Sequence, residues 1–339
     1  MHTKFTSFKA NLILLTGLLA ITGFMNQAFS QNKFLSFQNG IIENSTRETL
    51  PERGYKSFRG AGIELSYSFT GSQISSKQVN ETNYDFLHID GFHKMGQVGA
   101  PALPAHKEVI ALPVGATGKV RIINVEFTEY SGFNIHPALE PGSDVAGSDE
   151  PEFVKDEIVY TSNKFFPEHI VEIANTGLNR GIPLAFTEVR PVQFNPVTGV
   201  VRVYSKIEVA IDFEGGEGSF NSIAQNNSRH FTNLLKLKVI NSDDIPNGVE
   251  SGVKSGNKNY ILVTNDEYLE SAKMLANWKR QLGYSVDLVS QSTWTAAEIK
   301  EAIHSRYESW TPKPDFFAIL GDHAGAFAVP GEIHQDYMY

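Results

Sequence analysis

The chain has 339 residues, of which 41% are hydrophobic and 20% charged, with no cysteine and a formal net charge of −9. The lack of cysteine excludes disulfide bonds, thiolate metal sites and a cysteine nucleophile within these residues. The acidic balance argues against a nucleic-acid-binding protein, which needs a basic surface to neutralise phosphates. At roughly 100 to 200 residues per domain, the length predicts two domains.

Residues 1–30 have the pattern of a secretory signal peptide. Two lysines precede an apolar run, and the segment ends in the small-residue pattern Ala28-Phe29-Ser30. The run is shorter than the roughly 20 apolar residues that a membrane-spanning helix needs, and no later segment is long and apolar enough to span a membrane. We therefore expect cleavage between Ser30 and Gln31. The protein is then exported through the periplasm to the cell surface or the medium.

Residues 31–240 predict an all-β domain. Short segments of alternating apolar and polar residues are separated by Gly, Pro, Asn and Asp turns, as in strands with one buried face. The clearest are Val120–Phe127 and Val200–Phe213, and the second is apolar at odd positions from Val201 except Ser205. An antiparallel sandwich or jelly-roll-like fold is the simplest architecture for such segments.

The strand at Val200–Phe213 is expected to form a hairpin with Leu184–Phe194. The connecting residues 195–199 include Pro196, which fixes φ, and Gly199, which permits a positive φ.

Composition shifts between Gly215 and Gly256 to glycine, asparagine and serine clusters, which are typical of a linker. The apolar segment Phe231–Ile240 inside it predicts a short docking helix or a strand instead. We place the linker at residues 241–258.

Residues 259–339 predict the beginning of an α/β domain. Three apolar strands alternate with two helices, and the expected strands are Tyr260–Thr264, Tyr284–Val289 and Phe316–Leu320. This alternation implies a parallel sheet with right-handed crossovers. Because so apolar a third strand needs both faces covered, we expect the domain to continue in a longer protein.

Local signals mark the ends of both helices. Asn265 is a suitable N-cap for the first helix, and Gly283 is expected to end it. Thr295 and Glu298 have the spacing of a capping box for the second helix.

Several segments resemble the gingipain-type cysteine peptidases, family C25, over nearly the whole chain. In the β domain the similarity lies in Gly99-Ala100-Pro101-Ala102-Leu103-Pro104 and in residues 190–199, which resemble stretches of that family's propeptide. In the α/β domain it lies in Tyr260–Thr264, residues 278–283 and residues 318–323, which resemble the start of the catalytic domain.

The resemblance implies a secreted zymogen. Its β-sandwich propeptide would occupy the active-site face of its own peptidase domain, assist folding and be removed by proteolysis. The catalytic domain would be caspase-like, with a Cys–His pair acting on protein or peptide substrates and no cofactor. The family's catalytic His lies in a Gly-His-Gly-like turn and its Cys follows a later strand, and neither motif occurs here, so we expect the chain as printed to be inactive.

Two groups of residues are candidates for function. Asp322 and His323 follow the third strand, where ligands bind in α/β sheets, and are candidates for lining a substrate cleft, with a strand-end cap as the alternative. Their Gly-Asp-His-Ala context differs from the family's catalytic His motif. Arg229, Lys236 and Lys238 are candidates for propeptide processing, and Arg229 has the most loop-like context.

The sequence predicts no metal site. The acidic residues between Asp144 and Glu157 lack EF-hand spacing and are expected to form a solvated loop, and His88 and His93 fit no zinc pattern.

The sequence leaves two functional hypotheses. One is a cysteine endopeptidase zymogen, and the other is an exported β-sandwich binding or adhesion protein whose α/β domain has no chemistry.

Overall fold

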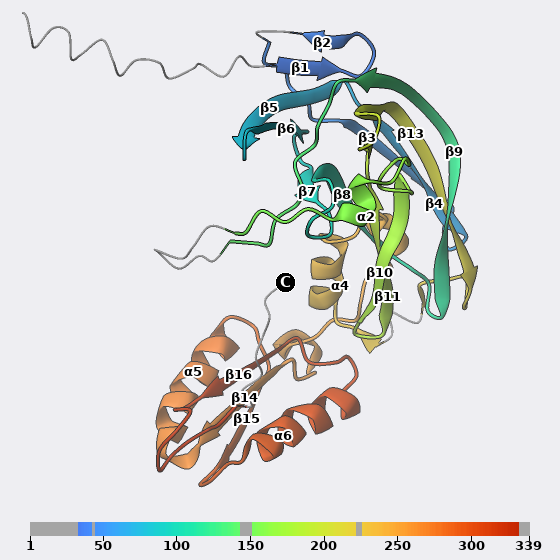
Figure 1. Cartoon of the computed structure of the whole chain (residues 1–339). Coiled ribbons are helices and arrows are strands. Elements are labelled where there is room, and N and C mark those ends of the chain that lie inside the picture. Colours follow the sequence, from blue (N-terminus) through green and yellow to red (C-terminus); the bar gives the residue numbers. More distant parts are fainter. Residues whose placement is uncertain (1–32, 43–44, 143–150, 222–225, 332–339) are drawn as a thin grey trace, which may run out of the picture.

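A computed structural model of the chain describes residues 33–42, 45–142, 151–221 and 226–331 (Figure 1). The predicted signal peptide and its cleavage position at Ser30–Gln31 lie outside the described residues, as does the first half of the acidic run, residues 144–150. None of the helices in these ranges is long and apolar enough to cross a membrane.

Three antiparallel sheets form the β domain. The first has the order β2-β1-β5-β6, with bounds Gly40–Ile42, Lys33–Ser36, Gly71–Val79 and Thr82–His88. The second has the order β10-β11-β8-β7, with bounds Val171–Asn179, Ile182–Val189, Leu103–Ala111 and His93–Met95. The third has the order β12-β13-β4-β3, with β9 on the other side of β13, and bounds Val192–Asn195, Val200–Gly215, Gly62–Ser68, Glu52–Ser57 and, for β9, Ala116–Ser131.

Strand β13 is the central strand of the third sheet and pairs with three other strands. It pairs with β9 over its whole length, while its other edge is shared by β12 and then β4. The predicted alternation is confirmed, because Val201, Val203, Ile207, Val209 and Ile211 are all buried. The predicted interruption at Ser205 coincides with a register shift between Tyr204 and Lys206, which is the place of a β-bulge.

One large core lies between the three sheets. Its fully buried side chains come from every sheet, and they include Leu35, Leu65, Tyr67, Ile110, Phe194 and Ile207. The short helix α2 (Glu157–Tyr160), capped by Asp156, adds Tyr160 to this core.

The predicted pairing of Leu184–Phe194 with β13 is wrong for most of that segment. Only β12 forms the hairpin through residues 195–199, whereas β11 leaves the third sheet and pairs with β8 and β10. The two strands are separated by Arg190-Pro191, where proline removes a ladder donor and allows the chain to change sheets.

The α/β domain has a three-stranded parallel sheet in the order β15-β14-β16. The strands span Val286–Gln291, Tyr260–Asn265 and Phe316–Leu320, and the helices are η3 (Asp266–Tyr268), α5 (Leu269–Gln281) and α6 (Ala296–Ser309). Gly283 follows α5 as expected, and Thr295 and Glu298 form the expected capping box. Asn265 accepts from the Glu267 amide and so caps the 3₁₀ turn η3, which leads into α5 at Tyr268.

The two helices cover opposite faces of this sheet, as Figure 1 shows. Helix α5 packs Ala272 and Ala276 against one face, and α6 packs Ile299 against the other. The central strand β14 is buried on both faces. In β16, Phe317 and Ile319 stay 62% and 43% exposed, so within the described residues that strand is covered on one face only.

Helix α4 (Arg229–Lys236) lies between the β domain and the α/β domain (Figure 1). The segment Phe231–Ile240 is therefore mainly helical, one of the two expected alternatives. Two 3₁₀ turns follow, η1 (Ser242–Asp244) and η2 (Val253–Ser255).

We expect Ile207→Ala to destabilise the β domain by about 2 to 5 kcal/mol, because it removes a fully buried side chain from β13 and leaves a cavity. Ile123→Ala on the paired strand β9 is the matched control, since Ile123 is 46% exposed. Urea unfolding of both variants checks this, and equal losses would contradict the described core.

Candidate functional site

The carboxyl end of the sheet carries the two predicted cleft residues. Asp322 and His323 follow β16 and are both exposed. The Asp322 carbonyl accepts from the Val329 amide at 2.7 Å, and the Gly331 amide donates to His323 Nδ1 at 3.5 Å. Among the described residues, neither side chain contacts a candidate nucleophile. Their role in a cleft stays a prediction, and within the described ranges no group of three or more acidic or histidine residues is placed to hold a metal ion.

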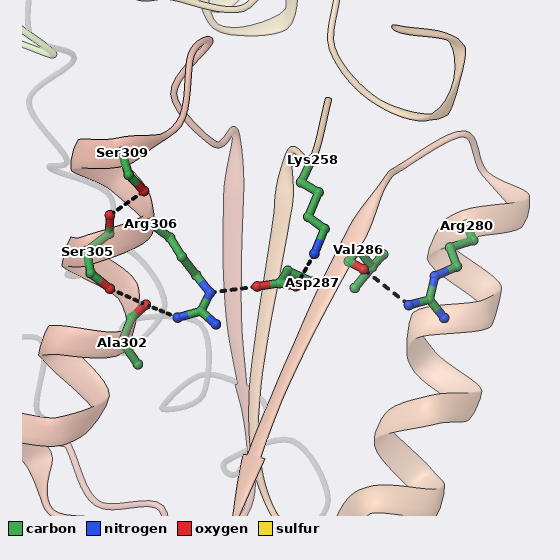
Figure 2. Close-up of polar contacts among 8 residues, drawn as sticks. All are labelled: Lys258, Arg280, Val286, Asp287, Ala302, Ser305, Arg306 and Ser309. Atoms are coloured by element: carbon green, nitrogen blue, oxygen red, sulfur yellow. Dashed lines mark hydrogen bonds and ion pairs between the residues drawn. The ribbon is translucent and has the colours of Figure 1, made fainter. Parts of the chain in front are cut away.

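The amino end of the sheet holds an ionic network around Asp287 of β15 (Figure 2). Lys258, directly before β14, donates to one carboxylate oxygen, and Arg306 Nε of α6 donates to the other at 2.6 Å. Burial by itself raises the pKa of Asp287, but these hydrogen bonds outweigh it, so the pKa of the carboxyl lies below its usual value. The network fixes α6 to the sheet edge, and Arg306 also donates to the Ala302 carbonyl at 2.8 Å.

A second carboxylate, Asp315, lies directly before β16. Its side chain binds residues from three other places in the chain. One oxygen accepts from the Ser228 hydroxyl, and the other accepts from Ser251 Oγ at 3.0 Å and Asn259 Nδ2 at 3.1 Å. Ser228 is fully buried and is also the N-cap of α4. Asn259 is buried and its side-chain oxygen accepts from the Ser285 amide at 2.9 Å, which fixes the entry to β15. We call Asp315, Ser228, Ser251 and Asn259 the junction cluster.

Arg180 contributes a contact from the β domain to the same place. It lies at the β10–β11 turn, and its Nη2 donates to the Pro314 carbonyl at 2.8 Å. Its guanidinium lies over the Phe231 ring at 4.4 Å and faces the Tyr307 ring at 5.9 Å. Cation–π contacts of this kind contribute about 0.5 to 2 kcal/mol. Because Phe231 belongs to α4 and Tyr307 to α6, Arg180 connects the β domain with helix α4 and with the α/β domain.

The processing candidates lie beside this junction. Arg229 is the first residue of α4, its amide donates to the Val249 carbonyl at 2.7 Å, and its side chain pairs with Glu250. The loop-like context predicted for Arg229 is therefore wrong, because the Ser228 cap starts a helix there. Lys236 ends the same helix and donates to Asn247 at 3.0 Å. Lys238 is exposed in the turn after it. Cleavage at any of the three stays a prediction.

The segment Gly99–Pro104 has a structural role, because its backbone binds two other segments of the β domain. The Gly99 amide donates to the Ala138 carbonyl at 2.8 Å, and the Gly99 carbonyl accepts from the Asp156 amide at 2.9 Å. Gly99 has a φ of +86°, and a Cβ there would lie 2.9 Å from the Asp156 nitrogen. This glycine therefore lets the chain hold residues 138 and 156 side by side.

Residues 190–199 also have structural roles. Gln193 donates to the Pro167 carbonyl at 2.7 Å and accepts from the Tyr204 hydroxyl at 2.6 Å. Asn195 closes the following turn, because its side-chain oxygen accepts from the Val197 amide at 3.1 Å and Gly199 takes a φ of +64°.

Comparison with protein families connects both halves of the chain. The C25 propeptide family matches residues 56–245, more than half of the chain, and peptidase family C25 matches residues 253–339. The chain belongs to the C25 propeptide family and continues into the start of a peptidase family C25 domain. The boundary between the two matches lies next to the junction cluster, and the order of the matches is the order predicted from the resemblance.

Curated relatives agree with this family. The chain is 25% identical to Lys-gingipain of Porphyromonas gingivalis over 292 residues, which cover 82% of this chain and 16% of the relative. It is also 25% identical to Gingipain R2 over 301 residues, covering 83% of this chain and 40% of the relative. The chain thus spans about a sixth of Lys-gingipain.

Two solved structures from the same organism also match. A structure of zymogenic gingipain K matches with 24% identity and a TM-score of 0.43 over 55% of this chain and 99% of that chain. A complex of the RgpB pro- and mature domains matches with 21% identity and a TM-score of 0.49 over 57% and 98%.

The predicted fold class is confirmed: an all-β propeptide domain is followed by the beginning of an α/β C25 domain with parallel strands. The peptidase hypothesis is favoured over the alternative of a binding or adhesion protein. The junction cluster and Arg180 were not predicted. The one local signal is that a polar residue directly precedes each parallel strand: Asn259 before β14, Ser285 before β15 and Asp315 before β16.

We expect Asp287→Asn to destabilise the α/β domain at neutral pH, because it weakens the contacts with Lys258 and Arg306. A carboxyl whose pKa is lowered by folding contributes stability above its unfolded pKa and loses it as the pH falls through the folded pKa. The difference in unfolding free energy between wild type and variant should therefore shrink toward acid. Urea unfolding at several pH values checks this, and a constant difference would contradict the ionic role.

Proposed function

We propose that the chain is the N-terminal part of a secreted cysteine endopeptidase zymogen, in which the β domain is an inhibitory and folding-assisting propeptide. The observation that carries the proposal is the succession of a C25 propeptide match and a C25 peptidase match in one chain, with the two domains in contact. Its first partner is then its own peptidase domain, and its later partners are the protein or peptide substrates of the longer enzyme.

Chemistry by a thiolate requires residues that the printed chain does not contain. The chain has no cysteine, and the exposed His323 lies in a bend after β16 with no nucleophile beside it in the described residues. Peptide hydrolysis by a Cys–His pair needs a thiolate to attack the carbonyl and a histidine to transfer protons. We therefore propose that residues 1–339 alone do not hydrolyse peptides.

The contacts between the domains support a propeptide that remains with its peptidase before processing. The Ser228 and Ser251 hydroxyls and the Arg180 guanidinium all reach the residues directly before β16. These contacts are at the amino end of the sheet, whereas α/β ligands bind at the carboxyl end, so they support attachment of the propeptide, and its inhibitory role needs a separate test. Export is supported by the basic, apolar and small-residue pattern of residues 1–30.

The test is an inhibition assay with the exported form, residues 31–339. We expect no hydrolysis of Lys- or Arg-amide substrates by this protein alone. Added in equimolar amount to a purified mature C25 cysteine peptidase, it should reduce the hydrolysis rate. The same amount added to papain is the control and should leave its rate unchanged. Equal rates of the C25 peptidase with and without the protein would contradict the inhibitory role.

A further inference from the structure

The segment after Arg229 packs into a second, smaller apolar cluster of the β domain. Phe231, Leu235, Val239 and Ile245 are buried in one cluster, where they pack with Ala111, Ile182, Leu184 and Phe220. Burial of an apolar side chain of this size contributes about 1.5 to 3 kcal/mol. The segment from α4 to Ile245 therefore holds to the β domain by itself.

Polar contacts fix the end of the same segment. The Ile240 amide donates to the Val109 carbonyl at 2.9 Å. Fully buried Asn241 accepts from the Ala111 amide at 3.0 Å and donates to the Ala111 carbonyl at 2.9 Å. Asn241 thus pairs with β8 as a neighbouring strand residue would.

This docking limits what the predicted processing sites can achieve. A cut after Arg229, Lys236 or Lys238 leaves Val239–Ile245 covalently attached to the α/β domain, while it stays docked in the β domain. The two domains then remain joined through this segment. After a cut on the carboxyl side of Ile245 the docked segment stays with the β domain and no longer links it to the α/β domain.

The first basic residue on that side is Lys254, in the tight turn between Gly252 and Gly256. Lys254 is exposed, Val253 beside it is 57% exposed, and both flanking glycines have a positive φ, +98° and +75°. The turn is closed by backbone hydrogen bonds, from the Gly252 amide to the Asn257 carbonyl at 3.0 Å and from the Ser255 amide to the Gly252 carbonyl at 3.2 Å. A turn tip of small residues is the kind of site where proteolytic nicking concentrates.

The next basic residue, Lys258, is less suited to cleavage. Its ammonium pairs with Asp287, and its carbonyl side leads directly into buried Asn259 and the fully buried strand β14. A protease that cuts there must open the parallel sheet, whereas one that cuts after Lys254 opens a surface turn.

We propose that Lys254 is the processing site whose cleavage frees the propeptide, an inference that rests on the proposed function. Water adds across the Lys254–Ser255 peptide bond, the C–N bond breaks, and the products are a Lys254 carboxylate and a Ser255 amine. After this cut the domains are held by noncovalent contacts alone, which include those of the junction cluster and Arg180. They also include the hydrogen bonds from the Lys313 amide to the Asn226 carbonyl at 3.1 Å and from the Val253 amide to the Gly283 carbonyl at 3.2 Å, and the ring contact of His230 with Phe316. The propeptide can then dissociate.

Limited digestion of residues 31–339 with trypsin tests this assignment. Samples are taken over time, passed through gel filtration at raised ionic strength and analysed by intact mass. We expect a fragment that begins at Ser255 to form as the two domains separate. Lys254→Gln should slow separation by about tenfold or more, because the remaining accessible cuts leave the docked segment attached. Its nicked products should elute together.

Lys238→Gln is the matched control, since Lys238 is an exposed lysine in a turn on the amino side of the docked residues. It should leave the separation rate unchanged. Urea unfolding of both variants establishes that they fold like wild type. The assignment is overturned if Lys254→Gln separates as fast as wild type, if Lys238→Gln slows separation, or if no fragment begins at Ser255. Trypsin makes the cut, so failure of C25 inhibition would not alter this result.

Discussion

The arrangement of the two domains depends on the carboxylate of Asp315. It accepts hydrogen bonds from Ser228, Ser251 and Asn259, so one side chain joins the start of helix α4, the connecting segment and the entry to the central strand. Hydrogen bonds to an ionised acceptor contribute about 1.5 to 3 kcal/mol each. Ser228 is buried, caps helix α4 and binds this carboxylate, so loss of the hydrogen bond to Asp315 also weakens the start of the helix.

The contacts that hold the domains together lie at the opposite end of the sheet from the candidate cleft residues. The ionic network of Asp287, the junction cluster and Arg180 all lie at the amino ends of the parallel strands. Asp322 and His323 lie at the carboxyl ends. A propeptide anchored at the amino end of the sheet keeps its peptidase domain in place, and among the described residues none of these anchoring contacts involves Asp322 or His323. The docked residues Val239–Ile245 extend this anchor into the β domain, which is why the location of a cut decides whether the domains part.

The sequence predicted the α/β elements well because their signals are local. The Asn265 cap, the Thr295 and Glu298 capping box and Gly283 each act within one helical turn of the residues they define. Sheet membership in the β domain is a nonlocal property, and alternation alone could not show that β11 leaves β13 at Arg190-Pro191. The junction cluster joins residues separated by 56 to 87 positions, so no sequence window contains it. Arg229 was misread because a buried serine cap looks like a polar loop residue in the sequence.

Hydrogen–deuterium exchange of residues 31–339 and of the Asp315→Asn variant tests the central role of this carboxylate most directly. The account predicts faster exchange of the amides in residues 226–250 of the variant, because the Ser228 cap and the Ser251 contact weaken together, with unchanged exchange in the buried strand β13 as the internal control. Unchanged exchange in residues 226–250 would contradict the account.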